Sequence, residues 1–550
     1  MPYNAADMFE HTVDVVPDRP ALICGDERRT YAELEARANR VAHHLLHAGI
    51  RPGDHVGIYG HNSTAWVEAL LGILKARAVP VNINFRYVED ELRYLFDNAD
   101  LVGLVFDRRF APRVAAVSDE LPLLRTLVMV EDGSHAACDG LEATVFEDAL
   151  ATQSPERDFG ERSGDDQIII YTGGTTGLPK GVMWRSEDIF FALAGGTDPF
   201  TREKVTSEWQ HAEAAAASAG QLVMLNTPPL MHGAAFVGTL MCFFQGNVNV
   251  LMPHFDAADI WRVIARHRVN SVLIVGDAMG RPMIEALETM EADGEQLDLS
   301  CLLSLSSSAA VFSPAVKDRF LQRFPNLVIT DSIGATESGF NGIVTVGKDN
   351  TAMRGGGPTV APGRDTVVLD EHLRPVAPGS GVVGKVARGG NIPLGYYKDP
   401  AKTAETFVIA ADGRRYAMPG DFATVEADGT ITLLGRGSVC INTGGEKVFA
   451  EEVEQILKAH PDVFDAVVVG VPDERWGQRV AAVVQPRGGR RPDLATLDTH
   501  CRRHLAGYKV PRELHLVTEI VRSPSGKPDY PWARQLAEAG THRADRMPTS

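Results

Sequence analysis

Residues 165–184 read DDQIIIYTGGTTGLPKGVMW, and this stretch joins an expected strand to an expected loop. The apolar run Ile168–Tyr171 has the length and composition of a buried strand. The TGGTTGLPKG loop that follows can turn tightly, bring backbone N–H groups close to a polyanion and add hydroxyl and Lys180 donors. Its spacing does not fit the G-x-x-x-x-G-K-S/T pattern of a Walker A loop. The stretch therefore predicts a phosphate-binding loop over Thr172–Lys180, with a flexible surface loop as the alternative.

The segments before this loop alternate between helix and strand patterns. Thr30 and Glu33 form a T-x-x-E capping box ahead of apolar residues at helical spacing. Asp54–Tyr59 predicts a short strand, and Trp66–Leu74 returns to helical periodicity. Strands interleaved with helices predict a layered α/β fold with a largely parallel sheet. The Ala-rich residues 206–220 predict a surface helix or a partly ordered insertion without chemistry of its own.

The composition changes near Gly435, where a second unit is expected to begin. Residues 447–460 carry apolar residues on one helix face, and two strand patterns follow at 465–471 and 479–485. Asp493 is placed to cap a further helix that carries Leu494, Leu497, Cys501 and Leu505. We therefore predict a large N-terminal domain (1–436) with layered mixed and parallel sheets, and a small mobile α+β domain (437–550).

The bulk composition limits the classes of function. The hydrophobic content of 44% is typical of a soluble globular protein, and the net charge of −18 argues against generic nucleic-acid binding. The six cysteines are scattered without CxxC spacing, so neither a zinc site nor a disulfide framework is expected. The N-terminal residues do not resemble a signal peptide, and no apolar run approaches the ~18 residues of a membrane span. We expect a cytoplasmic protein.

Further motifs follow the phosphate loop in order. They read SSSAA (306–310), DSIGATESG (331–339), YAMPGD (416–421), LGRGS (434–438) and SPSGKPDY (523–530). With the loop, this ordered set resembles the signature of the adenylate-forming superfamily, which comprises acyl-CoA synthetases, peptide-synthetase adenylation domains and beetle-type luciferases. The resemblance covers nearly the whole chain. It implies an ATP-dependent, AMP-forming acyl-CoA synthetase that uses ATP, Mg²⁺ and CoA.

The resemblance assigns ATP contacts to residues of each motif. Ile333 stands where the family usually has an aromatic residue, so apolar contacts would replace base stacking, and Pro419 replaces a threonine donor near the ribose. The implied contacts are Thr172, Gly173, Gly174, Thr175, Thr176, Gly177 and Lys180 for the phosphates, Ser307, Ser308, Ala309, Asp331, Ser332, Ile333 and Gly334 for the base, and Asp421 and Arg436 for the ribose.

Four residues match catalytic positions of the family. Thr336 would contact the α-phosphate and Glu337 would hold Mg²⁺, a cation that often takes one carboxylate plus substrate phosphates. Lys527 would stabilise the negative charge that builds up when a carboxylate attacks the α-phosphate. His232 in PPLMHGAA would gate the acyl pocket and the CoA tunnel, with an ordinary core histidine as the alternative. Outside their motifs, Glu337 would be a solvated loop acid and Lys527 a surface lysine.

The same resemblance implies a two-step reaction with domain rotation. An acyl-adenylate forms first, and the small domain then turns about Ser438, a hinge assigned by position only, and opens a path for the CoA thiol. Gly444, Gly445 and Glu446 match a loop that reaches the CoA tunnel after this rotation.

The substrate prediction depends on more detailed likeness. Strings such as INFRYVEDELRYLFDNAD and GNIPLGYYKD, together with Trp184 and Arg185, resemble actinobacterial ligases that activate steroid side-chain acids. We predict a 3-oxocholestenoate-type acid, with a medium- or long-chain fatty acid as the first alternative. A non-catalytic nucleotide-binding protein and a luciferase-like monooxygenase stay open, whereas a peptide-synthetase adenylation domain would normally be followed by a carrier domain. A homodimer is plausible by resemblance.

Overall fold

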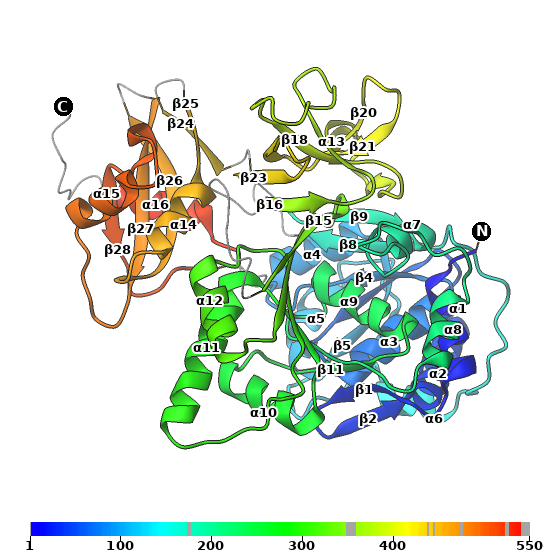
Figure 1. Ribbon diagram of the computed structural model, residues 1–550. Coiled ribbons are helices and arrows are strands. Elements are labelled where there is room, and N and C mark those ends of the chain that lie inside the picture. The colour runs from blue at the N-terminus through cyan, green and yellow to red at the C-terminus, as the bar shows by residue number, and fades with distance from the viewer. Residues whose placement is uncertain are drawn as a thin grey trace.

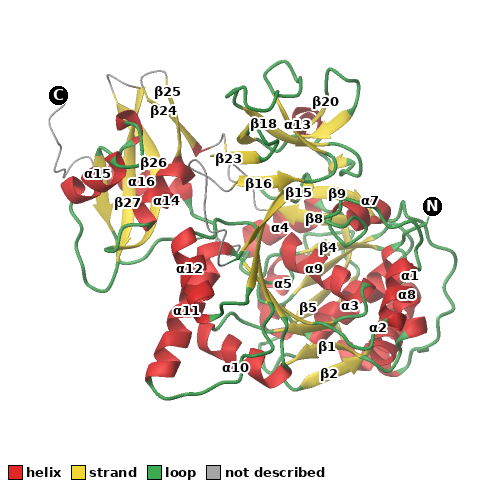
Figure 2. Cartoon of the chain, in the orientation of Figure 1, coloured by secondary structure: helices red, strands yellow, loops and turns green. Residues whose placement is uncertain are grey.

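The computed structural model describes residues 2–172, 178–347, 359–436, 439–443, 446–473, 477–522 and 527–540. Within these ranges the chain forms two sheet-based layers in a large body, an upper β-rich part and a smaller α+β domain beside them (Figure 1). Figure 2 shows that helices surround the sheets of the large body, whereas the upper part consists mostly of strands and loops.

An eight-stranded sheet contains the strand predicted at 168–171, which pairs with the following strand β9 as a hairpin. Its strands from β8 to β7 run parallel, and β9 and β19 extend one edge in the antiparallel sense. This order confirms the expected α/β layer with a largely parallel sheet. Across the sheet the strands are β19 (Gly395–Tyr396), β9 (Lys180–Arg185), β8 (Gln167–Thr172), β4 (Val79–Asn82), β3 (His55–Tyr59), β5 (Leu101–Asp107), β6 (Thr126–Val130) and β7 (Thr144–Val145).

A second, fifteen-stranded sheet is mixed among the described residues. The strands from β1 to β14 in sheet order run parallel, and those from β15 onward pair antiparallel. Its strands are β2 (Glu27–Thr30), β1 (Pro20–Cys24), β11 (Val248–Leu251), β10 (Val223–Asn226), β12 (Ser271–Ile274), β13 (Ser304–Ser307), β14 (Val328–Ala335), β15 (Gly339–Val346), β16 (Thr359–Pro362), β23 (Ile431–Arg436), β22 (Asp421–Val425), β18 (Gly384–Arg388), β21 (Arg415–Ala417) and β20 (Phe407–Ile409), with β17 (Thr366–Leu369) beside β18.

The helices of the large body pack into layers on both sheets. Successive residues of a strand point to opposite faces, so Ile168 and Ile170 enter one core while Ile169 and Tyr171 enter another. One core lies between the sheets around α1, α2, α3 and α9, and two others lie under α4 and α5 and under α10 to α12. The helices are α1 (Ala5–Val15), α2 (Tyr31–His47), α3 (Thr64–Lys75), α4 (Glu89–Asn98), α5 (Ala111–Ser118), α6 (Phe146–Ala151), α7 (Ser186–Ala192), α8 (Gln210–Ala217), α9 (Gly233–Phe244), α10 (Ala257–His267), α11 (Gly276–Ala292), α12 (Pro314–Arg323) and α13 (Pro400–Thr406).

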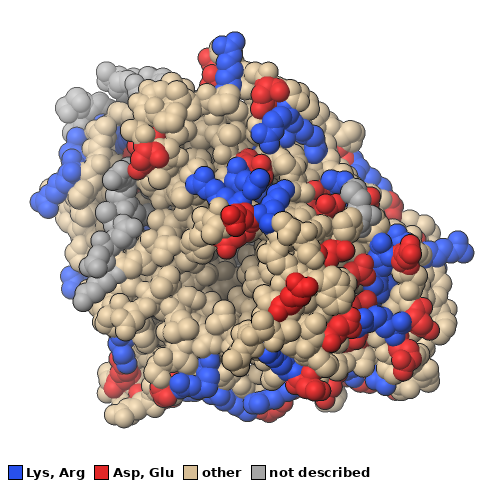
Figure 3. Space-filling model, turned by 45° about the vertical axis from the view of Figure 1, so that its right-hand side comes forward, with Lys and Arg blue, Asp and Glu red and all other residues tan. Residues whose placement is uncertain are grey.

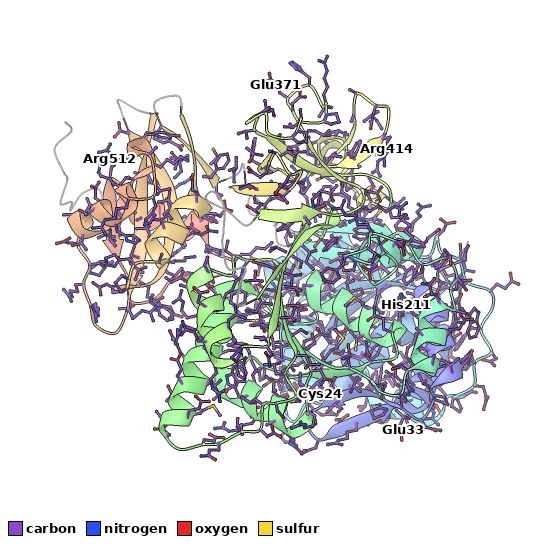
Figure 4. All side chains as sticks on the ribbon, in the orientation of Figure 1. Cys24, Glu33, His211, Glu371, Arg414 and Arg512 are labelled. Atoms are coloured by element: carbon purple, nitrogen blue, oxygen red, sulfur yellow. The ribbon has the colours of Figure 1, made fainter. Side chains whose placement is uncertain are left out.

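Helix α2 begins at the capping box that the sequence predicted. The Thr30 N–H donates to Glu33 Oε2 at 2.8 Å, and the Glu33 N–H donates to Thr30 Oγ1 at 3.2 Å. Figure 4 shows Glu33 at the foot of the large body, far from Arg512 in the small domain. The strand predicted from Asp54 begins one residue later, and the Trp66–Leu74 helix lies within α3.

The small domain has its own sheet and cores, as expected of an α+β unit. Its strands and helices are β25 (Glu446–Phe449), β24 (Cys440–Thr443), β27 (Gly477–Pro486), β26 (Val463–Asp473) and β28 (Glu513–Leu516), with α14 (Ala450–Lys458), α15 (Leu494–Arg502) and α16 (Tyr530–Gly540). Asp493 caps α15 by accepting from the Thr496 N–H at 2.8 Å. The helix ends at Arg502, whereas Leu505 was expected on it, and residues 503–504 form a turn there.

The Ala-rich segment forms a surface helix, α8, as expected. Ala212 and Ala215 are buried, and Arg19 donates to the Ala215 carbonyl at 2.9 Å. All six cysteines are free thiols. Over the described ranges, every helix is too short or too polar to cross a bilayer.

Candidate active site

The predicted phosphate loop is the connection of the β8–β9 hairpin. Thr172, the last residue of β8, pairs with Lys180, the first residue of β9, so the ladder fixes both ends of the loop. The glycines and threonines predicted at 173–177 lie outside the described residues. Thr172 is the carboxyl end of β8, which pairs with β4 in parallel, and the carboxyl ends of such strands are where α/β proteins usually bind ligands.

Lys180 forms an ion pair with Asp399, a residue that the sequence did not single out. Asp399 also caps α13, since its Oδ1 accepts from the Lys402 N–H at 2.9 Å. The hydrogen bond from Lys180 and the backbone donor of Lys402 lower the pKa of the Asp399 carboxyl. The lysine of the predicted phosphate site is therefore held by a carboxylate on the neighbouring helix.

Strand β9 also holds the backbone at Thr336. Trp184 is fully buried, and its indole N–H donates to the Thr336 carbonyl at 3.0 Å. The start of α9 lies on another side of Thr336, because a Cβ built at Gly233 would come within 3.3 Å of Thr336 Oγ1. The half-buried His232 occupies the N-cap position of α9 and directly precedes Gly233, the residue that approaches Thr336.

Glu337, the predicted magnesium ligand, is oriented by the strand beside β9. Tyr396 lies opposite Val182 in the β9–β19 ladder, and its hydroxyl donates to Glu337 Oε1 at 3.2 Å. No group of three or more His, Cys, Asp or Glu side chains able to hold a metal occurs among the described residues. A single half-buried carboxylate fits Mg²⁺ bound mainly through substrate phosphates and water.

The residues predicted at the base come together on two neighbouring parallel strands. Ser307 on β13 lies opposite Asp331 on β14, and the Ser332 hydroxyl donates to the Ser307 carbonyl at 3.2 Å. After β13 the chain turns at Ala309, an exposed residue in the left-handed region with φ +68°. Ile333 and Gly334 continue β14 toward Thr336.

The predicted ribose residues are adjacent in the upper part of the large sheet. Asp421 begins β22 and lies opposite Arg436, the last residue of β23. Ser438, Gly444 and Gly445 lie outside the described residues, and Glu446 begins β25 of the small domain. The end of β23 therefore leads directly from the predicted ribose site into the small domain.

Lys527 belongs to the small domain. It is half-buried and lies three residues before α16, beside the bridge between Arg522 and Pro528. The phosphate and base residues all belong to the large body, so the predicted catalytic lysine comes from a separate unit (Figure 1). A space-filling view shows a hollow at the centre of one face, with basic and acidic side chains at its rim (Figure 3).

Two α/β layers, a hairpin that carries the predicted phosphate loop and a small C-terminal α+β domain are the arrangement expected of an adenylate-forming enzyme. Comparison with protein families supports this class. Residues 9–397 match the AMP-binding enzyme family, and residues 452–527 match the AMP-binding enzyme C-terminal domain. The chain belongs to the AMP-binding enzyme family.

Relatives that match over nearly their whole length indicate which kind of AMP-binding enzyme this chain is. The chain is 55% identical to the medium/long-chain-fatty-acid–CoA/3-oxocholest-4-en-26-oate–CoA ligase of Mycobacterium tuberculosis, over 98% of this chain and 96% of that one. It is 52% identical to a 3-oxocholest-4-en-26-oate–CoA ligase of Rhodococcus rhodochrous, over 100% and 98%. A crystal structure of the anthranilate CoA ligase AuaEII with anthranoyl-AMP shares the fold, with a TM-score of 0.82, 23% identity and 98% coverage of each chain. The protein is an AMP-forming acid–CoA ligase, and ATP and CoA are its co-substrates.

Two residues at this site, Tyr396 and Asp399, were missed by the sequence analysis. Both lie in GNIPLGYYKD (390–399), a string whose resemblance to other ligases assigned no role to either residue. Its local signal is an aspartate before a proline at the first helical position, which predicts the start of α13 but not an ion pair with Lys180.

Proposed function

We propose that this chain converts 3-oxocholest-4-en-26-oate and medium- to long-chain fatty acids to their CoA thioesters through an acyl-adenylate. The observation that carries the proposal is the arrangement around β9. Lys180 on this strand pairs with Asp399, and Trp184 on the same strand contacts Thr336. Tyr396 on the neighbouring strand β19 contacts Glu337. The substrate class is supported by relatives that are 52–55% identical over nearly the whole chain.

In the first half-reaction the substrate carboxylate attacks the α-phosphate of ATP, forming the acyl-adenylate and releasing pyrophosphate. Lys180 and the 172–177 loop bind the phosphates, Thr336 donates to the α-phosphate, and Lys527 stabilises the charge that develops there. Ser307, Ser308, Ala309 and the 331–334 segment hold the base, and Asp421 and Arg436 hold the ribose. Glu337 holds Mg²⁺, which, when bound, neutralises phosphate charge.

In the second half-reaction the thiol of CoA attacks the acyl-adenylate and AMP leaves. The boundary between the large body and the small domain lies at 436/437, and the small domain turns about Ser438. This rotation moves Lys527 away from the adenylate and brings Gly444, Gly445 and Glu446 to the CoA tunnel. Polar contacts between the two units support such movement, because interfaces of this kind allow domain motion.

The acyl group is placed along the start of α9. Ala234 and Ala235 lie two and three residues after His232, and the small size of their side chains is the feature on which this assignment rests. His232 gates this pocket where it meets the CoA tunnel. The free state of all six cysteines supports a cytoplasmic location. We also propose a homodimer, which light scattering of the purified protein tests.

Thioester formation by the purified full chain tests the substrate. We expect turnover of both 3-oxocholest-4-en-26-oate and palmitate, with the higher kcat/KM for the steroid acid. A clear preference for palmitate would remove the steroid assignment, and absence of AMP formation with either acid would remove the adenylation assignment.

Lys527→Ala separates the two half-reactions. Pyrophosphate exchange should be lost, because no ammonium remains to stabilise the developing charge, whereas thioester formation from supplied acyl-adenylate should be largely kept. Unchanged exchange would take Lys527 out of the mechanism.

A further inference from the structure

A buried lysine contacts the carboxylate predicted at the base. Lys317 lies on α12, and its ammonium is 2.7 Å from Asp331 Oδ2. The two side chains are only 4% and 8% exposed. Lys317 also lies over the ring of Phe312, with 5.5 Å between Nζ and the ring centroid, so it has little water around it. An ion pair this enclosed is expensive to form and strongly constrained in geometry.

The surroundings of Asp331 make Lys317 necessary for its charge. The pKa of Asp331 is raised, because burial and the nearby Asp277 outweigh Lys317, which lowers the pKa through its charge and a hydrogen bond. Asp277 forms its own ion pair with Arg281 at 3.2 Å. With Lys317 removed, the remaining influences on Asp331 would favour the neutral acid.

Lys317 contacts only one of the two carboxylate oxygens of Asp331, Oδ2. Among the described residues, Oδ1 accepts no hydrogen bond, and Asp331 lies opposite Ser307 in the base segment. An ionised carboxylate only accepts hydrogen bonds, whereas a protonated one also donates. The ionised form therefore suits an amino group at position 6 of a purine and disfavours a keto oxygen there.

We propose that Lys317 is a positioning residue for nucleobase selection, which orients Asp331 and favours its ionised form, so that the enzyme accepts adenine and rejects 6-keto purines. This inference rests on the proposed function, which places Asp331 at the base.

The test compares ATP with ITP, whose base carries a 6-keto group, in pyrophosphate release with palmitate. In Lys317→Met, which keeps the apolar stem and removes the charge, the ratio of kcat/KM for ATP to that for ITP should fall by about tenfold, the size of one charge-assisted hydrogen bond. The KM for palmitate should not change. If the ion pair were merely structural, its loss would lower kcat/KM equally for ATP and for ITP. The ratio would then stay unchanged, and this result would overturn the inference.

Arg323→Met is the matched control. Arg323 lies on the same helix and pairs with an acid, Glu291, at 2.7 Å, but it is half exposed and lies on the side of α11. Its ratio should equal that of the unmodified protein. A fall in this variant would assign the effect to α12 as a whole and overturn the specific role of Lys317.

Asp331→Asn separates this inference from the proposed function. Lys317 would take the amide oxygen, the NH₂ group would face the base, and the ratio should fall. An unchanged ratio in Asp331→Asn would mean that Asp331 does not read the base. A fall there without a fall in Lys317→Met would overturn only the role of Lys317.

The double variant keeps the inference testable if Lys317→Met does not fold. Replacing both partners leaves no buried unpaired charge, so Lys317→Met/Asp331→Asn should fold. In the double variant no ammonium turns the amide NH₂ group toward the base, so its ratio should be higher than that of Asp331→Asn. Equal ratios in these two variants would show that Lys317 does not orient the side chain at position 331 and would overturn the inference.

Discussion

At the scale of single residues, the hydroxyl of Tyr396 contacts the carboxylate proposed to bind Mg²⁺. Tyr396→Phe removes the donor to Glu337 Oε1 but keeps the ring, which packs against Phe407 with 6.0 Å between centroids. The carboxylate then loses one constraint on its orientation, and second-shell losses of this kind typically weaken metal binding about 10- to 100-fold. We expect the Mg²⁺ concentration for half-maximal pyrophosphate release to rise, with little change in melting temperature.

Tyr416→Phe is the control for that prediction. Its hydroxyl also donates to a carboxylate, that of Asp412 at 2.8 Å, but on the β20–β21 hairpin of the upper part, where Figure 4 labels Arg414. Its Mg²⁺ dependence should stay unchanged. Equal Mg²⁺ curves for Tyr396→Phe and the unmodified protein would show that Tyr396 does not orient Glu337.

At the scale of elements, the first turn of α13 has two functions that substitution can separate. Asp399→Asn keeps a side-chain oxygen that caps α13 and removes the negative charge beside Lys180. ATP binding then no longer has to break the ion pair between Lys180 and Asp399. The variant also lacks one negative charge that repels the phosphates of ATP. We expect a lower KM for ATP at low salt, a smaller difference at high salt, and an unchanged melting temperature.

Asp399→Ala removes both functions and completes the comparison. It should share the lower KM for ATP and lose about 1 kcal/mol of stability, the usual value of a helix cap. A higher KM in both variants would mean instead that Asp399 holds Lys180 in its binding position.

A second element-scale prediction concerns strand β26 and the segment before Lys527. Arg522 donates to Asp465 Oδ2 at 2.6 Å, and Lys458 lies 3.3 Å from Asp465 Oδ1. Burial raises the pKa of Asp465, but Lys458 and Arg522 outweigh it, so the pKa is lower than in the unfolded chain. The carboxylate therefore stabilises the fold above the unfolded pKa of about 3.9, and this contribution is lost as the pH falls through the lower folded pKa.

Asp465→Asn should accordingly destabilise the protein at pH 7, by roughly 3 kcal/mol if the cost matches other broken buried pairs. The difference from the unmodified protein should shrink as the pH falls below about 4. Denaturant unfolding followed at several pH values measures both. A difference that does not depend on pH would assign the effect to packing and not to charge.

The separation of contacting residues along the chain explains which structural features the sequence predicted. Thr30 with Glu33 and Asp493 with Thr496 are caps within three residues, and the starts of their helices were predicted correctly. By contrast, Trp184 and Thr336 are 152 residues apart, Lys180 and Asp399 are 219 apart, and Tyr396 and Glu337 are 59 apart. The motif residues were predictable because they resemble a family pattern, but their partners depend on strand order, which no local pattern contains.

At the scale of the whole molecule, the large body and the small domain meet through a charged contact. Arg487, after β27, forms an ion pair with Glu285 of α11 at 3.2 Å. The guanidinium groups of Arg281 and Arg487 both lie over the ring of Phe464 on β26, at 5.5 and 5.9 Å from its centroid. A groove of about 610 Å³ lies at this contact, lined in part by Glu285, Arg319, Phe464 and Arg487. The interface is therefore polar and incompletely filled.

Arg487→Ala should loosen the arrangement of the two units without unfolding either. The small domain has its own buried cores, so its stability does not depend on Arg487. Loss of the ion pair and of one cation–π contact removes attraction across the interface, and polar domain interfaces permit relative motion by default. We expect a larger radius of gyration in solution scattering and faster proteolysis between residues 436 and 446, at an unchanged melting temperature. Arg490→Ala is the control, because Arg490 lies three residues further on and pairs with Asp462 of its own domain at 2.6 Å. If Arg490→Ala expands the protein as much as Arg487→Ala does, the contact with Glu285 and Phe464 does not hold the two units together.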